Sequence, residues 1–69
     1  MMKDLSEQLG CKIRARRKEV SLSQETLALE SGLDRSYLGR VERGEVNITV
    51  EKLYIIAKHL QCNPTELLP

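Results

Sequence analysis

Apolar residues recur every three or four positions along nearly the whole chain, which is the spacing of one face of an α-helix. No segment shows the alternation of apolar and polar residues that a half-buried strand requires. The 69 residues include two tyrosines but neither phenylalanine nor tryptophan, so the core must be aliphatic. The sequence therefore predicts an all-α fold, with a single domain over residues 1–69 near the lower size limit for a core without disulfides or metals.

Capping residues and glycines divide this pattern into five predicted helices. Asp4 and Glu7 form a capping-box pattern at the start of the first helix. N-cap residues precede the other four helices: Ser23, Asp34, Thr49 and Asn63. Gly32 and Gly44 end the second and third helices. The predicted ranges are 4 to about 19, 24–31, 35 to about 43, 50 to about 60, and a short last turn with Pro64 first and Glu66 as capping-box partner.

The predicted helices carry apolar residues that can meet in one core. The first helix has an inward stripe of Leu5, Leu9 and Ile13. The stripe of the fourth helix consists of Val50, Leu53, Ile56, Ala57 and Leu60. The second and third helices carry the apolar anchors Leu27, Leu33, Leu38 and Val41. Because Ala28 leaves room for a close crossing and the turn at Gly32 is tight, these two short helices are typical of a helix-turn-helix.

Positive charge is unevenly distributed along a chain whose net charge is only +1. The segment KIRARRK (12–18) carries five positive side chains, and Arg35, Arg40 and Arg43 form a second group. This distribution predicts a molecule with one basic face, which suits a nucleic-acid partner. On charge alone, an ordinary solvated helix surface is the simpler interpretation.

Several function classes lack the residues that they need. Cys11 and Cys62 form no CxxC pair, and with His59 they are too few for a zinc site, so we expect no metal or cofactor. No apolar run approaches the length of a membrane span, and no signal peptide is evident, so we expect a cytoplasmic protein with reduced thiols. The chain has no pairing of nucleophile and base and no glycine loop that binds phosphate, so we expect neither enzymatic activity nor a small-molecule ligand.

The segment LSQETLALESGLDRSYLGRVERG (22–44) resembles the Cro/CI-like, or xenobiotic-response-element, helix-turn-helix family of bacterial and phage transcription regulators. The resemblance extends from about Leu9 to Leu68, and GLDRSYLGRVERGEVNIT is most similar to the small controller proteins of restriction-modification systems. It implies a five-helix DNA-binding domain that regulates transcription by binding a palindromic operator in double-stranded DNA as a homodimer.

Two alternatives remain open, a phage-type repressor and an antitoxin-type autoregulator with a protein partner. Antitoxins usually need additional sequence to neutralise their toxin, and no further residues follow the last predicted helix, which favours the controller protein. A neighbouring gene for a toxin or for a restriction endonuclease would separate these functions.

The third helix is the predicted recognition helix. Its apolar stripe packs inward, and its outward residues suit the major groove: Arg35, Ser36, Tyr37, Gly39 and Arg40. We expect Arg35 and Ser36 to read bases, because residues at the start of a recognition helix reach deepest. Arg40 reads a base or holds a phosphate. Tyr37 packs against thymine methyl groups or bonds a phosphate, although a half-buried tyrosine with a solvated hydroxyl is nearly as good an interpretation.

Five further residues are expected to contact the DNA backbone. Ser23 and Gln24 lie at the start of the second helix, whose free amides suit a phosphate, and the family uses the matching glutamine in this way. Arg43, Asn47 and Thr49 flank the loop after the recognition helix. Such contacts position the protein without reading sequence. Glu45 stands where many relatives carry a positive residue, and its charge repels phosphate.

The resemblance also assigns structural roles. It implies an internal ion pair between Arg17 and Glu42, which removes both from the DNA surface. Ser21 stands where the family commonly has glycine, so a left-handed backbone there would be mildly strained.

A two-fold interface is predicted at the end of the chain, since one such domain reads only a few base pairs. Ile55 falls outside the apolar stripe of the fourth helix, which is unusual for isoleucine on a monomer. The predicted interface consists of Ile55, His59, Cys62, Pro64 and Leu68, with His59 as a rim contact at most.

Overall fold

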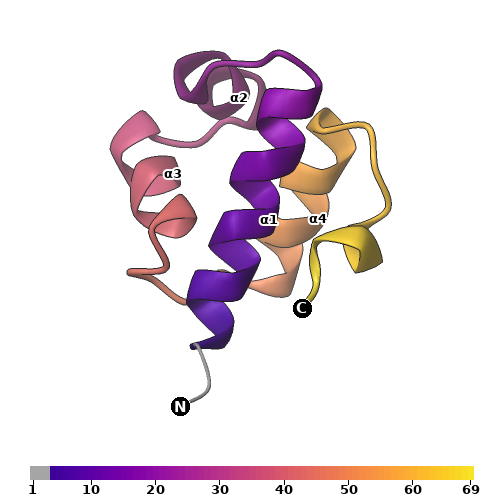
Figure 1. Cartoon of the computed structure of the whole chain (residues 1–69). Helices are drawn as coiled ribbons and strands as arrows, with labels where there is room; N and C mark the ends of the chain where they lie inside the picture. Colours follow the sequence, from indigo (N-terminus) through magenta and orange to yellow (C-terminus); the bar gives the residue numbers. More distant parts are fainter. Residues whose placement is uncertain (1–3) are drawn as a thin grey trace.

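Four α-helices and one short 3-10 helix make up the computed structural model, which describes residues 4–69 (Figure 1). The elements are α1 (Leu5–Glu19), α2 (Gln24–Ser31), α3 (Arg35–Glu42), α4 (Val50–His59) and the 3-10 helix η1 (Pro64–Leu67). The all-α prediction is confirmed, and the described residues contain no strand. None of these helices is long and apolar enough to cross a membrane.

The prediction of five helices was wrong in its count, because the last segment is a single 3-10 turn. The hydrogen bonds of this four-residue turn join residues three apart. The Glu66 amide donates to the Asn63 carbonyl at 2.9 Å, and the Leu68 amide donates to the Thr65 carbonyl at 3.3 Å. The predicted capping box is present, since the Asn63 amide donates to Glu66 Oε2 at 2.9 Å.

Most of the predicted N-caps form the hydrogen bonds expected of them. Asp4 accepts from the Ser6 amide, Ser23 from the Thr26 amide and Thr49 from the Lys52 amide. Asp34 occupies the N-cap position of α3, but its carboxylate accepts no helix amide and instead lies 3.4 Å from the Ser36 hydroxyl. The first amides of α3 therefore lack a side-chain cap.

The core lies where the helices meet and is aliphatic, as predicted. It consists of Ile13, Leu27, Ala28, Leu38, Val41, Leu53, Ile56, Ala57, Leu60 and Leu67. Leu9 is half-buried against this core, and two further residues of the predicted stripes lie outside it, since Leu5 is 68% exposed and Val50 is 71% exposed. Each is the first residue of its helix, where the neighbouring elements do not cover the side chain. Periodicity places a residue on a face but does not show how far the core extends along that face.

Within residues 4–69, the left-handed backbone conformations lie in the short connections that follow the helices. Gly32 has φ 69°, the left-handed conformation predicted for the end of α2. Ser21 has φ 60°, so it adopts the conformation for which the family uses glycine. Gln61, with φ 57°, does the same after α4, and no signal in the sequence indicated it.

Two glycines allow α1 and the end of α3 to touch through their backbones. A Cβ atom on Gly10 would collide with the Val41 carbonyl oxygen and lie 2.6 Å from the Glu42 carbonyl oxygen. Gly44 has φ 76°, and a Cβ atom there would lie 2.6 Å from Glu7 Cα. The sequence did not indicate the role of Gly10, because the residues around a glycine in a helix do not show which segment packs against it.

We predict that Gly10→Ala destabilises the protein by about 2 kcal/mol. The added methyl group meets backbone that cannot rotate away, and overpacking of this kind costs about 1–3 kcal/mol or more. We expect an overpacking cost of about 3 kcal/mol, at the top of that range. Alanine has a better helix propensity than glycine, which offsets about 1 kcal/mol of this cost.

Gly39→Ala is the matched control for this variant. The new Cβ atom would lie 3.3 Å from Arg43 Nη1 and 3.7 Å from Gln24 Oε1, which are ends of flexible side chains. Gly39→Ala should therefore raise the free energy of unfolding by up to about 1 kcal/mol. Chemical denaturation checks both values, and equal effects in the two variants would contradict the close contact at Gly10.

Candidate nucleic-acid interface

The predicted helix-turn-helix is formed by α2 and α3, which lie next to each other in Figure 1. Ala28 is 2% exposed, as expected of a small residue in the contact between these helices. In the turn, the Leu33 amide donates to the Ala28 carbonyl at 2.8 Å, and Leu33 packs against the core. The turn therefore closes directly on α2 and holds α3 against it.

The side chains of α3 divide into a buried and an exposed set. Leu38, Val41 and Glu42 are buried. Arg35, Ser36 and Arg40 are exposed, and Tyr37 is half-buried. The exposed set contains three of the four residues predicted to read bases, and they project from one short helix.

Gly39 does not face solvent, contrary to the prediction. It is buried, because the Arg43 and Gln24 side chains lie over it. A missing Cβ atom at this position makes room for those two side chains, and the position offers no open approach to DNA.

The Tyr37 ring has two cations near it. Lys52 Nζ lies 4.5 Å from the centre of the Tyr37 ring, and the Arg40 guanidinium carbon lies 6.0 Å from it. Lys52 belongs to the first turn of α4, so this contact adds a cation from α4 to Arg35 and Arg40 of α3. Sequence reasoning missed Lys52, since only the packing of α4 brings it to Tyr37.

The two predicted backbone contacts at the start of α2 have different surroundings. Ser23 is exposed and caps α2, and its hydroxyl also donates to Thr26 Oγ1 at 3.0 Å. Gln24 is half-buried, and its amide nitrogen donates to Glu42 Oε1 at 2.9 Å. This hydrogen bond to Glu42 of α3 therefore orients the Gln24 side chain.

The predicted backbone contacts after α3 already have partners within the chain. Arg43 binds Glu45 through Nε at 2.8 Å and through Nη2 at 3.4 Å. This hydrogen bond lowers the pKa of the Glu45 carboxyl, so the carboxylate stays charged beside Arg43. Asn47 Oδ1 accepts from the Ser6 hydroxyl at 2.8 Å, and Thr49 caps α4. A phosphate at Arg43 would have to compete with Glu45.

Arg17 and Glu42 form a buried ion pair between α1 and α3. Arg17 Nε lies 2.7 Å from Glu42 Oε2, Arg17 Nη2 lies 3.0 Å from Glu42 Oε1, and Arg17 Nη1 donates to the Leu22 carbonyl at 2.9 Å. The Arg17 side chain is 10% exposed and the Glu42 side chain 2%. Because Glu42 also accepts from Gln24, the pair connects α1, α2 and α3.

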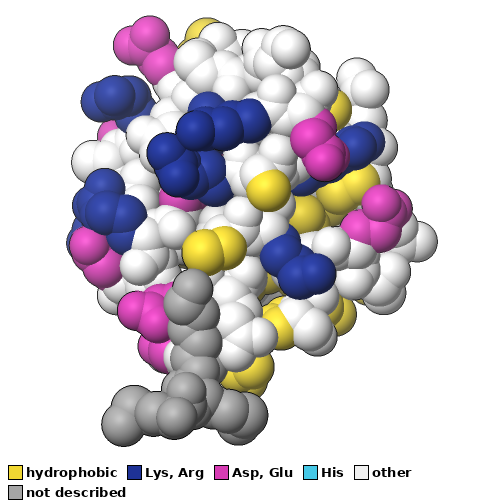
Figure 2. All heavy atoms as spheres, viewed as in Figure 1, with side chains coloured by type: hydrophobic (Ala, Val, Ile, Leu, Met, Phe, Trp, Pro, Cys, Tyr) yellow, Lys and Arg dark blue, Asp and Glu magenta, His cyan; other side chains and the backbone are white. Residues whose placement is uncertain are grey.

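Only part of the basic segment 12–18 faces solvent. Arg16 donates to the carbonyls of Leu60 and Gln61 at 3.1 and 3.0 Å, so it caps the end of α4, and Arg17 is buried. The three remaining cations are exposed: Lys12, Arg14 and Lys18. In Figure 2 most of the dark blue side chains on the visible face lie in its upper left part, over α1 and toward α3. The basic face is therefore narrower than the sequence suggested.

The residues of the predicted two-fold interface lie on α4 and the segment that follows it. Ile55 is 36% exposed and Leu68 is 46% exposed. His59, Cys62 and Pro64 are half-buried, and burial raises the pKa of the Cys62 thiol. Tyr54, which sequence reasoning did not include, is 60% exposed beside Ile55. Ile55, Leu68 and Tyr54 therefore keep part of their apolar side chains at the surface of the single chain.

The sequence matches a known protein family and several named relatives. The family model described as helix-turn-helix matches residues 13–67, a range that includes α2, the turn and α3. The chain is 46% identical over 65 residues to the control protein C.SmaI of Serratia marcescens, covering 94% of this chain and 77% of that protein. It is 38% identical over 60 residues to the control protein C.BamHI of Bacillus amyloliquefaciens, covering 86% and 74%.

A solved structure of a controller protein has the same fold as this chain. The crystal structure of the restriction-modification controller protein C.AhdI from Aeromonas hydrophila superposes with a TM-score of 0.89. The two chains are 44% identical, and the superposition covers 91% of this chain and 96% of that one.

Proposed function

This chain belongs to the helix-turn-helix family of DNA-binding transcription regulators, and we propose that it is a controller protein of a restriction-modification system that binds a palindromic operator as a homodimer. The observation that carries this proposal is the division of α3, whose apolar residues are buried while Arg35, Ser36 and Arg40 project together into solvent. The similarity to proteins named as control proteins supports the specific role. A regulator of this kind acts where the DNA is, so we place it in the cytoplasm.

In this proposal α3 lies in the major groove and its exposed residues read bases. The Arg35 guanidinium can donate two hydrogen bonds to O6 and N7 of guanine, and the Ser36 hydroxyl can bond to several base edges. Arg40 lies more than one turn further along and contacts a base or a phosphate. The Tyr37 ring packs against a thymine methyl group or its hydroxyl bonds a phosphate, and Lys52 holds the ring in place.

The DNA backbone is contacted on both sides of the recognition helix. Ser23 and Gln24 present the start of α2 to one phosphate. Arg43, Asn47 and Thr49 approach the backbone from the connection between α3 and α4. These contacts set the register of α3 in the groove and carry no sequence information.

Dimerisation through the end of the molecule would place two recognition helices on one face of the DNA. The exposed apolar side chains of Ile55 and Leu68, with His59, Cys62 and Pro64, form the surface for a second copy. A two-fold axis there would set the recognition helices about 34–36 Å apart, which is one turn of DNA. The operator would then be an inverted repeat with the same symmetry.

We predict that Arg35→Ala weakens binding to the preferred operator by roughly 1–3 kcal/mol and relaxes discrimination at one base in each half-site. The Arg35 side chain is exposed, so the variant should keep the melting temperature of the wild type. Binding to a library of operators, each with one altered base pair, measures the discrimination.

Arg43→Ala is the comparison for this variant, because it removes a cation from the same surface at a position expected to contact phosphate. It should weaken binding to all sequences by a similar factor. If Arg35→Ala gives the same uniform loss as Arg43→Ala, then Arg35 does not read a base.

A further inference from the structure

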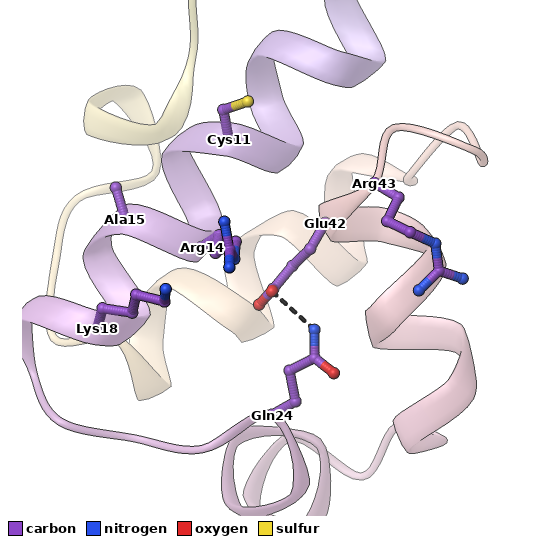
Figure 3. Close-up of a pocket in the computed structure, with 7 residues that line it drawn as sticks. All are labelled: Cys11, Arg14, Ala15, Lys18, Gln24, Glu42 and Arg43. Carbon is purple, nitrogen blue, oxygen red and sulfur yellow. Dashed lines mark hydrogen bonds between the residues drawn. The ribbon is translucent and has the colours of Figure 1, made fainter.

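We infer that the cleft between α1 and the helix-turn-helix holds the sugar-phosphate backbone of the bound DNA, outside the bases read by α3; this inference rests on the proposed function. The cleft has a volume of about 580 Å³. Arg14 and Lys18 of α1, Gln24 of α2, and Glu42 and Arg43 at the end of α3 line it (Figure 3). The DNA-binding surface proposed for α2, α3 and the connection to α4 includes no residue of α1, so this cleft enlarges that surface.

The two cations on α1 have no other role in the described part of the chain. Arg14 and Lys18 are exposed, and neither forms a hydrogen bond or ion pair with another residue of the range 4–69. Their neighbours in the sequence differ in this respect, since Arg16 binds carbonyls beyond α4 and Arg17 binds Glu42. Figure 3 shows Arg14 and Lys18 projecting from α1 into the cleft, with Gln24 and Glu42 across from them.

The one acidic group in the cleft does not cancel this charge. Both oxygens of Glu42 are engaged by Arg17, and Oε1 also accepts from Gln24. The ion pair is therefore neutral as a unit, and Arg43 is paired with Glu45, which does not line the cleft, so Arg14 and Lys18 remain as the two unpaired cations around it. Such a concave surface with one sign of charge attracts an anion more strongly than isolated surface cations do.

The position of the cleft indicates which anion it holds. Gln24 is both part of the cleft and the first residue of α2, where a backbone phosphate is expected. Arg43 is the residue after α3, so the cleft also borders the recognition helix. A DNA strand that passes the start of α2 can continue along the cleft toward Lys18 and Arg14. This continuity favours the backbone of the same duplex over a separate small anion.

The first test is the salt dependence of DNA binding by the double variant Arg14→Gln with Lys18→Gln. Each lost phosphate contact reduces the slope of log K against log salt by about 1, so the double variant, which loses two contacts in each protomer, should reduce the slope for the dimer by about 4. Its affinity for the operator and for a scrambled duplex should fall by the same factor. Lys12→Gln is the matched control, because Lys12 is an exposed cation of α1 that lies outside this cleft and lines a different groove.

An ethylation-interference experiment locates the contact on the DNA. Ethylation of one or two phosphates in each half-site should weaken binding of the wild type but not of the double variant. Identical interference patterns, or a slope unchanged from that of the wild type, would overturn the inference and leave the proposed function standing. A wild-type protein that binds no operator from a random DNA pool would instead overturn the proposed function and the inference together.

Discussion

Glu42→Ala is expected to lower the free energy of unfolding by about 3–5 kcal/mol, the largest effect on stability that we predict. The variant leaves the Arg17 guanidinium inside the protein with only the Leu22 carbonyl as a partner. A buried charge without its counterion costs far more than the ion pair itself contributes. A domain of this size has a total stability of only about 3–10 kcal/mol, so the variant should be partly or fully unfolded at 37 °C.

Thermal and chemical denaturation measure this effect, and Glu19→Ala is the control. Glu19 also pairs with an arginine, since Arg16 Nη1 lies 3.3 Å from Glu19 Oε1, but its side chain is 67% exposed. Exposed pairs contribute at most about 1 kcal/mol, so Glu19→Ala should leave the melting temperature nearly unchanged. Similar small losses in both variants would show that Arg17 and Glu42 are hydrated in solution.

Ile55→Glu is expected to give a folded monomer whose affinity for the palindromic operator is reduced by about 10²–10⁴. A two-fold axis near Ile55 would bring the two introduced carboxylates together in an apolar interface. The two like charges would be buried there without a counterion, which favours separation of the subunits. The loss in DNA affinity follows because a dimer makes binding of its second half-site nearly intramolecular. Ile55 is already 36% exposed in the single chain, so the fold should tolerate the change.

Sedimentation and gel shifts separate assembly from folding in this variant. Leu29→Glu is the control for sedimentation, because Leu29 is 79% exposed on α2 and is not one of the residues of the proposed interface. It should leave the dimer intact, while Ile55→Glu should sediment as a monomer with native helicity. A wild type that is monomeric at micromolar concentration, or an Ile55→Glu protein that still binds as a dimer, would contradict the interface.

Local signals in the sequence were sufficient for the four α-helices and for the exposed positions of Arg35, Ser36 and Arg40 on α3, but not for the buried Gly39. Hydrogen bonds within one turn determine where a helix begins, so Ser23, Thr49 and Asn63 could be placed as caps from the residue type and its neighbours. The helical repeat likewise separates Leu38 and Val41 from Arg35, Ser36 and Arg40 whatever the rest of the chain does. The family resemblance added what periodicity cannot show, the pairing of Arg17 with Glu42.

Contacts between distant segments were decided only by the tertiary structure. Arg16 and Arg14 look equivalent in the segment 12–18, yet Arg16 binds carbonyls at residues 60 and 61, while Arg14 remains in the open cleft. Lys52 reaches Tyr37 because α4 packs beside α3, and Gly10 matters because the backbone of α3 lies against it. Each of these depends on which surfaces meet after the helices have formed. A residue type and its spacing determine the face that a side chain occupies, whereas its partner on that face is set by packing across the whole core.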